Sequence, residues 1–120
     1  MMSRLGVWFM GVLAHLPVPL LRGIGALLGR VLFVLAAPRR KITLRNLELC
    51  FPEASEAQRT QWARESFIVF CQTWLDRSWL WSAPQSVVER RVKLKGAVHE
   101  LEGDVPTIIF APHFYGMDAG

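Results

Sequence analysis

The feature that most constrains this chain is an apolar N-terminal region that contains no acidic side chain before Glu48. Half of the 14 Lys and Arg residues lie in this region, whereas all 10 Asp and Glu residues begin at Glu48. Its two apolar stretches, residues 5–21 and 27–38, are each shorter than the roughly 20 residues of a spanning helix. Basic residues beside apolar sequence favour attraction to anionic lipid. The region therefore predicts a membrane anchor in preference to a buried soluble core.

Two prolines divide this anchor. Pro17 and Pro19 predict a turn between two helices, at about residues 4–16 and 18–37. One arrangement is a kinked or re-entrant anchor, with Arg22 and Arg30 facing protein or reaching lipid headgroups. The other is a helical hairpin that lies in one interface. The spacing of small residues at 25–29 allows a close helix contact, and simple packing is favoured over dimerisation.

A basic triplet, Arg39, Arg40 and Lys41, follows the anchor. Basic residues at the end of an apolar segment predict that this side faces the cytoplasm. A basic pI also suggests nucleic acid as a partner, but here the positive charge adjoins apolar sequence, so we expect no nucleic-acid binding. On the cytoplasmic side, Cys50 and Cys71 are expected to be reduced.

The rest of the chain has the charge balance of an ordinary domain. Residues 42–50 have helical spacing, and Ser55 with Gln58 matches a capping box that opens a helix to about residue 81. Its aromatic residues predict core packing, with contact to lipid or to an acyl chain as the open alternative. These aromatic residues are Trp62, Phe67, Phe70, Trp74 and Trp81.

Two short segments are typical of strands. Residues 92–96 alternate apolar and basic side chains, which predicts an edge strand, and residues 106–111 form a β-branched apolar run, which predicts a buried strand. The order of strand, helix and strand indicates an α/β fold.

His113 and Asp118 follow the second predicted strand. Polar residues at the carboxyl end of a buried strand are where open α/β sheets place active sites. Five residues correspond to about 500° on a helix, so the two side chains meet only if a turn intervenes, and Gly116 allows one. The carboxylate then fixes the imidazole tautomer and leaves the other nitrogen as a general base. Spacing alone leaves an ordinary loop open as the alternative. We expect no metal and no organic cofactor, since no ligand motif occurs.

The chain resembles the lipid A biosynthesis acyltransferases of Gram-negative bacteria. The resemblance rests on residues 39–52, the helix that follows Ser55, and residues 111–118 with the His-x4-Asp box. Members commonly carry Glu at the acidic position, where this chain has Asp118, and Asn or Thr near the middle, where it has Tyr115.

The resemblance implies an enzyme at the bacterial inner membrane that faces the cytoplasm. It would move a fatty acyl group from acyl carrier protein to a hydroxyl of a lipid A precursor, with His113 as base and Asp118 orienting it. We expect residues 1–37 to be the anchor and 38–120 the start of a glycerolipid-acyltransferase-like α/β domain, truncated after the box. The 120-residue piece is therefore expected to be inactive by itself.

The basic residues after the anchor are further candidates. We expect Arg39, Arg40, Lys41 and Arg45 to bind a phosphorylated glycolipid, membrane lipid or the acidic carrier protein. Two other functions stay open. One is acylation of another glycolipid or a lysophospholipid by the same pair, and the other is a non-enzymatic membrane-anchored helical protein.

Overall fold

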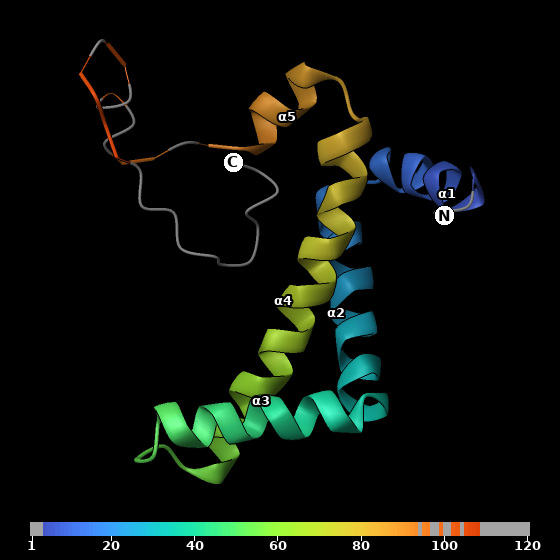
Figure 1. Ribbon diagram of the computed structural model, residues 1–120. Helices are drawn as coiled ribbons and strands as arrows, with labels where there is room; N and C mark the ends of the chain where they lie inside the picture. The colour runs from blue at the N-terminus through green and yellow to red at the C-terminus, as the bar shows by residue number, and fades with distance from the viewer. Residues whose placement is uncertain (1–3, 94, 97–98, 100–101, 104, 109–120) are drawn as a thin grey trace.

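The fold of the described residues is a set of packed helices. The computed structural model describes residues 4–93, 95–96, 99, 102–103 and 105–108. In Figure 1, α2 and α4 run side by side, α3 crosses them near one end, and α1 lies near the other. The helices are α1 (Arg4–Ala14), α2 (Val18–Leu35), α3 (Ala37–Cys50), α4 (Glu56–Ser82) and α5 (Gln85–Arg91).

Glycines bring α2 against the backbone of α4. A Cβ atom at Gly29 would lie 2.4 Å from the Cα of Ile68, and one at Gly25 would lie 2.9 Å from the Cα of Gln72. Real side chains do not tolerate such distances, so these two positions require glycine for the close approach. The expectation that residues 25–29 serve helix packing is confirmed, and the partner helix is α4 of the same chain.

A polar cluster fixes α2 to α4 near the N-terminal end of α2. Arg22 Nη2 donates to Asp76 Oδ2 at 2.8 Å, and Trp79 Nε1 donates to Asp76 Oδ1 at 3.1 Å. Gln72 Nε2 donates to the carbonyl oxygen of Arg22 at 3.0 Å. Asp76 is buried, and both of its carboxylate oxygens are bonded, as a buried charge requires. Of the two placements considered for Arg22, facing protein or reaching lipid headgroups, the structure shows contact with protein.

Two apolar clusters occupy the ends of the α2–α4 pair. At one end, α1 and α2 meet α4 through Leu13, Ala14, Leu21, Leu75 and Trp79. At the other end, a smaller cluster joins α2, α3 and α4 and contains Phe33, Ala63 and Phe67. In it the rings of Phe33 and Phe67 meet edge to face, with centroids 5.5 Å apart, a geometry worth ~1 kcal/mol beyond area burial.

Local sequence signals set most helix boundaries. The turn at Pro17 separates α1 from α2, as expected. The backbone N–H of Gln58 donates to Ser55 Oγ at 3.2 Å, which confirms the N-cap of α4. Pro84 follows the end of α4 and precedes α5. However, α3 begins at Ala37, so the basic triplet lies in its first turns. Pro38 is tolerated there because the first backbone N–H groups of a helix have no intrahelical acceptor.

The predicted α/β fold is wrong, because the residues that the structure describes contain no strand. Val92 and Lys93 follow α5 as irregular chain, and residues 106–108 are also irregular. Ile108 is 97% exposed, whereas a buried strand would cover it. A β-branched segment becomes a strand only when a neighbouring strand takes up its backbone hydrogen bonds, and the described residues supply no such neighbour. Residues 109–111 lie outside the described residues.

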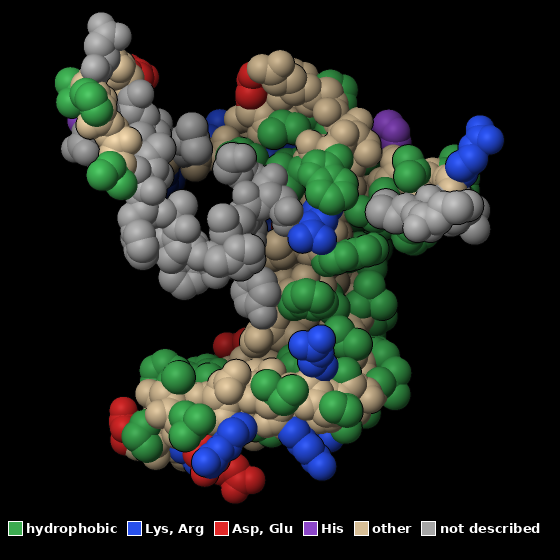
Figure 2. All heavy atoms as spheres, viewed as in Figure 1, with side chains coloured by type: hydrophobic (Ala, Val, Ile, Leu, Met, Phe, Trp, Pro, Cys, Tyr) green, Lys and Arg blue, Asp and Glu red, His purple; other side chains and the backbone are tan. Residues whose placement is uncertain are grey.

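The core-packing interpretation of the aromatic residues is right for Phe67 and wrong for three others. Phe67 is buried, whereas Phe70, Trp74 and Trp81 are exposed. Figure 2 shows hydrophobic side chains along this exposed face of the α2–α4 pair. Trp79, which was not among the aromatic residues predicted to pack in the core, is buried.

The helix α2 has the length and apolarity to cross a membrane. It contains 18 residues with a mean hydropathy of 1.8, and 22% of it is buried within the protein. By length and composition α2 is therefore a candidate membrane span. The core helix of a soluble protein and a signal sequence near the N-terminus can have the same length and composition.

Candidate functional site

The predicted catalytic pair, His113 and Asp118, lies outside the described residues. Its geometry is therefore untested, and its role stays a prediction. The described part of the chain does include all four predicted basic residues, which lie on α3 close to its junction with α2. Figure 2 shows Lys and Arg side chains gathered along the lower edge of this helix. This junction is the candidate site.

Arg40 is engaged within the protein. Its Nη1 donates to the carbonyl oxygens of Phe33 at 2.7 Å and Val34 at 3.2 Å. Its guanidinium also lies 5.4 Å from the centroid of the Phe33 ring. The last carbonyls of a helix have no intrahelical partner and carry partial negative charge, which a cation stabilises. In the structure Arg40 therefore caps α2 and fixes its junction with α3.

Arg45 is also paired. Its Nη1 donates to Glu48 Oε2 at 2.6 Å, between positions i and i+3 of α3. This hydrogen bond, with the positive charge of Arg45, lowers the pKa of the Glu48 carboxyl. The carboxylate offsets the charge that Arg45 presents to an anionic ligand.

Arg39 and Lys41 are the exposed cations of the junction for which the structure shows no acidic partner among the described residues. Arg39 lies at a cavity of about 500 Å³ between α2, α3 and α4. Apolar side chains form most of its wall, two hydroxyl groups add polar atoms, and no acid lines it. The lining residues are Leu32, Ala36, Arg39, Thr43, Ser66, Phe67 and Phe70. Apolar walls with one cation suit an anionic amphiphile.

Thr43 and Ser66 were not predicted as site residues. Thr43 lies one helical turn after Arg39 and donates its hydroxyl to the Arg39 carbonyl oxygen at 3.1 Å. Spacing of four along α3 places both on one face, and that signal was available in the sequence. Ser66 comes from α4, and nothing local in the sequence indicates that α4 would meet α3 at that residue.

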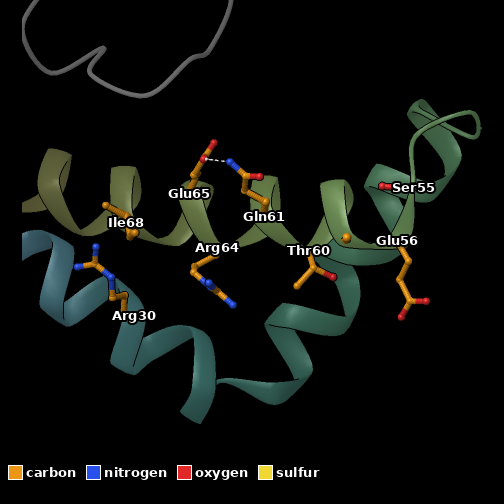
Figure 3. Close-up of a pocket in the computed structure, with 9 residues that line it drawn as sticks. Arg30, Ser55, Glu56, Thr60, Gln61, Arg64, Glu65 and Ile68 are labelled. Atoms are coloured by element: carbon orange, nitrogen blue, oxygen red, sulfur yellow. Dashed lines mark hydrogen bonds between the residues drawn. The ribbon is translucent and has the colours of Figure 1, made fainter.

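A second, larger hollow of about 1050 Å³ lies beside α4 (Figure 3). Arg30 from α2 and Arg64 from α4 line it together with Glu56 and Glu65, so its formal side-chain charges balance. Figure 3 shows Glu65 and Gln61 joined by a hydrogen bond, which measures 2.9 Å. The Arg64 guanidinium lies 5.6 Å from the centroid of the Phe33 ring. With both charge signs and little enclosure, this hollow favours no particular ligand.

The described residues offer no metal site and two free thiols. Among them, no group of three His, Cys, Asp or Glu side chains lies close enough to hold a metal ion. Cys50 is exposed and Cys71 is half-buried, and neither forms a disulfide. Burial raises the pKa of the Cys71 thiol, which makes it a poor nucleophile at neutral pH.

Comparison with known proteins identifies the family. The family model for bacterial lipid A biosynthesis acyltransferases matches residues 1–120. The lipid A biosynthesis lauroyltransferase of Escherichia coli K12 is 30% identical over 98 residues, which cover 82% of this chain and 32% of the relative. The palmitoleoyltransferase of the same organism and a lipid A biosynthesis acyltransferase of Shigella flexneri are each 27% identical over 120 residues, covering 94% of this chain and 39% of each relative. No solved structure matches the chain.

The chain thus spans about a third of the length of these curated relatives. The match nevertheless extends over the whole sequence, including the junction of α2 and α3 and the His-x4-Asp box. The chain belongs to the bacterial lipid A biosynthesis acyltransferase family.

Proposed function

We propose that the protein transfers a fatty acyl group from acyl carrier protein to a hydroxyl of a lipid A precursor. The observation that carries this proposal is the match of the family model to residues 1–120. The names of the relatives, which specify lauroyl and palmitoleoyl transfer in lipid A biosynthesis, support fatty acyl groups as the cargo. Because the chain spans about a third of the length of those relatives, we propose this activity for the whole enzyme.

The chemistry is assigned to His113 and Asp118. The imidazole of His113 takes the proton of the acceptor hydroxyl, and the Asp118 carboxylate holds the imidazole in the required tautomer. The acceptor oxygen attacks the thioester carbonyl, a C–O bond forms, and the C–S bond breaks. The imidazolium then returns the proton to the departing carrier thiolate, so no other reactant is needed.

The cavity at the α2–α3 junction is assigned to recognition of the acceptor. Arg39 and Lys41 are exposed and without an acidic partner among the described residues, whereas Arg40 and Arg45 already bind groups of the protein. Arg39 and Lys41 therefore supply charge for a phosphate group, and the apolar wall of the cavity accommodates hydrocarbon.

The membrane location follows from two properties of the N-terminal half. The helix α2 presents a large exposed apolar surface, and the basic triplet follows it directly. The exposed apolar surface favours attachment to a bilayer. The Lys and Arg residues favour the cytoplasmic side of the bacterial inner membrane. The proposed donor, acyl carrier protein, is expected on that same side.

The direct test is acyl transfer by the purified whole protein. Acyl carrier protein thioester is supplied with a lipid A precursor, a lysophospholipid or another glycolipid, and the products are identified by mass spectrometry. The proposal predicts acylation of the lipid A precursor, a loss of roughly 10²–10⁴-fold for His113→Ala, and retained activity for Asp118→Glu but not Asp118→Asn.

Other outcomes reject the proposal in different ways. Acylation of the lysophospholipid alone would replace the acceptor and keep the chemistry. Full activity of His113→Ala would remove the assigned base. Transfer to none of the acceptors by a folded, membrane-bound protein would favour a non-enzymatic anchored protein.

A further inference from the structure

We infer that α2 lies with α4 along one leaflet, with its outer face in the lipid and both of its ends on the same side of the bilayer. This inference rests on the membrane attachment proposed above. It concerns a surface of α2 that no contact within the described residues covers, and it decides between crossing the bilayer and lying on it.

The outer face of α2 is apolar and free of charge. The buried residues Leu21, Gly25, Gly29 and Phe33 recur every four positions and face α4. At 3.6 residues per turn, exposed apolar residues occupy an arc of roughly 120° on the remaining surface of the helix, and both arginines of the helix fall outside that arc. The exposed members of this arc are Leu20, Leu27, Leu28, Val31, Val34 and Leu35, with exposed fractions from 46% to 74%.

The length of α2 is at the short end of the range for crossing. Its 18 residues correspond to about 27 Å, whereas the hydrocarbon core is about 30 Å thick. A helix with one apolar face and polar flanks instead suits the plane of the interface. Arg30 lies outside the apolar arc and is exposed, so a lying helix leaves its guanidinium within reach of lipid phosphates.

The position of α4 is tied to that of α2. Gly25 and Gly29 place the backbones of the two helices in contact at Gln72 and Ile68. The ion pair of 2.8 Å between Arg22 and Asp76 adds a polar connection near the start of α2. If α2 crosses the bilayer, the facing part of α4 must therefore lie at a similar depth.

That part of α4 is unsuited to the hydrocarbon core. Arg64 and Glu65 are both exposed and lie within about one helical turn of Ile68, which contacts Gly29 near the middle of α2. A charged residue at the centre of a spanning helix is costly, because it loses its hydration in the hydrocarbon. In the lying arrangement α4 is on the water side of α2, and its charges stay hydrated.

Separation of the helices does not remove the difficulty. If α2 crossed alone, it would leave Asp76 without Arg22 and would carry both Arg22 and Arg30 into lipid. The glycine surface of α2 would also lose its complementary backbone on α4. The lying arrangement keeps all of these contacts.

The test places one thiol at each end of α2 in the whole protein. Cys50 and Cys71 are replaced by Ala, and His15→Cys or Pro38→Cys is then introduced, both at exposed positions just outside α2. Sealed inside-out and right-side-out membrane vesicles are treated with a maleimide that cannot cross the membrane. Detergent-treated vesicles show that each thiol can react, and retained acyl transfer shows that each variant is folded.

We expect both thiols to react in the same vesicle orientation and neither to react in the other until detergent is added. Reaction of the two thiols in opposite orientations would show that α2 crosses, and would overturn the inference without affecting the proposed acyl transfer. Failure of the folded, active protein to sediment with membranes would contradict the membrane attachment itself. The vesicle experiment thus tests the arrangement of α2, and the acyl-transfer assay tests the proposed function, so that either can be rejected without the other.

Discussion

The contact between α2 and α4 and the junction between α2 and α3 are built in different ways. Along the first, glycine allows backbone to meet backbone, and two residues of α4 bind Arg22 of α2: the buried Asp76 accepts from its guanidinium, and Gln72 donates to its carbonyl oxygen. At the second, α3 has no fully buried residue and is held mainly by Arg40, which caps α2, and by partly buried leucines against Phe33.

This difference separates stability from recognition. The α2–α4 contact leaves no room for added atoms, so its substitutions act on folding. The α2–α3 junction carries exposed cations beside a cavity of about 500 Å³, so we expect many of its substitutions to leave the fold intact and to act on the proposed binding of the acceptor. Variants of the two regions should therefore give opposite results in unfolding and binding measurements.

The largest expected effect on stability is that of Gly29→Ala. The new Cβ would lie 2.4 Å from the Cα and 2.8 Å from the backbone nitrogen of Ile68, which no side-chain rotation relieves. We expect a loss of about 3 kcal/mol in the free energy of unfolding, measured by denaturant unfolding in detergent.

Gly23→Ala is the matched control in the same helix. Nothing lies within 4 Å of a Cβ at Gly23, so the higher helix propensity of alanine should stabilise the protein by about 0.5–1 kcal/mol. If the two alanine variants unfolded alike, α2 and α4 would not be in the close contact described here.

A smaller loss is expected for Asp76→Ala. The substitution removes the acceptor of the buried Trp79 indole N–H and the partner of Arg22. The side chain of Arg22 is 44% exposed, so its charge can return to water, and most of the cost, about 2 kcal/mol, comes from the unpaired indole. Asp76→Asn keeps a carbonyl oxygen for Trp79 and should recover part of the loss in thermal unfolding. Equal losses for both variants would show that the charge, and not the hydrogen bond, carries the effect.

The smallest effect concerns the exposed pair of Arg45 and Glu48. Because the hydrogen bond from Arg45 lowers the pKa of the Glu48 carboxyl in the folded protein, the pair stabilises the fold above the unfolded-state pKa. That contribution is lost as the pH falls through the folded-state pKa, and solvent screening keeps it small. A carbon-13 NMR titration should show a higher midpoint for Glu48 in Arg45→Ala, with no measurable change in thermal unfolding at neutral pH. An unchanged midpoint would mean that the pair does not form in solution.

The sequence indicated the helices well because their limits depend on local chemistry. Pro17, Ser55 and Pro84 each act on the backbone within one turn, and the structure has boundaries at all three. The glycines at 25 and 29 likewise predicted a helix contact, since glycine within a helix lets a second helix approach closely. The sequence did not say which helix would be the partner.

Errors arose where the outcome depends on distant partners. The segment at 92–96 has strand-like alternation, but no neighbouring strand is present among the described residues. The 27-residue helix α4 meets α1, α2 and α3 along its length, so no single stripe of it is buried, and Trp79 is covered while Trp74 is exposed. The ligand-binding role of Arg40 stays a prediction. Its capping of α2, which the sequence did not indicate, depends on the angle at which α3 leaves α2. His113 and Asp118 remain predictions from the family motif.

The separation of stability from recognition is tested most directly by the double variant Arg39→Glu, Lys41→Glu in the whole enzyme. Steady-state acyl transfer is measured against the concentration of phosphorylated acceptor, with thermal unfolding and membrane sedimentation measured alongside. We predict an unchanged unfolding temperature, an unchanged kcat and a KM raised roughly tenfold or more, as expected for loss of a charge-assisted contact. An unchanged KM, or a loss of folding comparable to that of Gly29→Ala, would contradict the account.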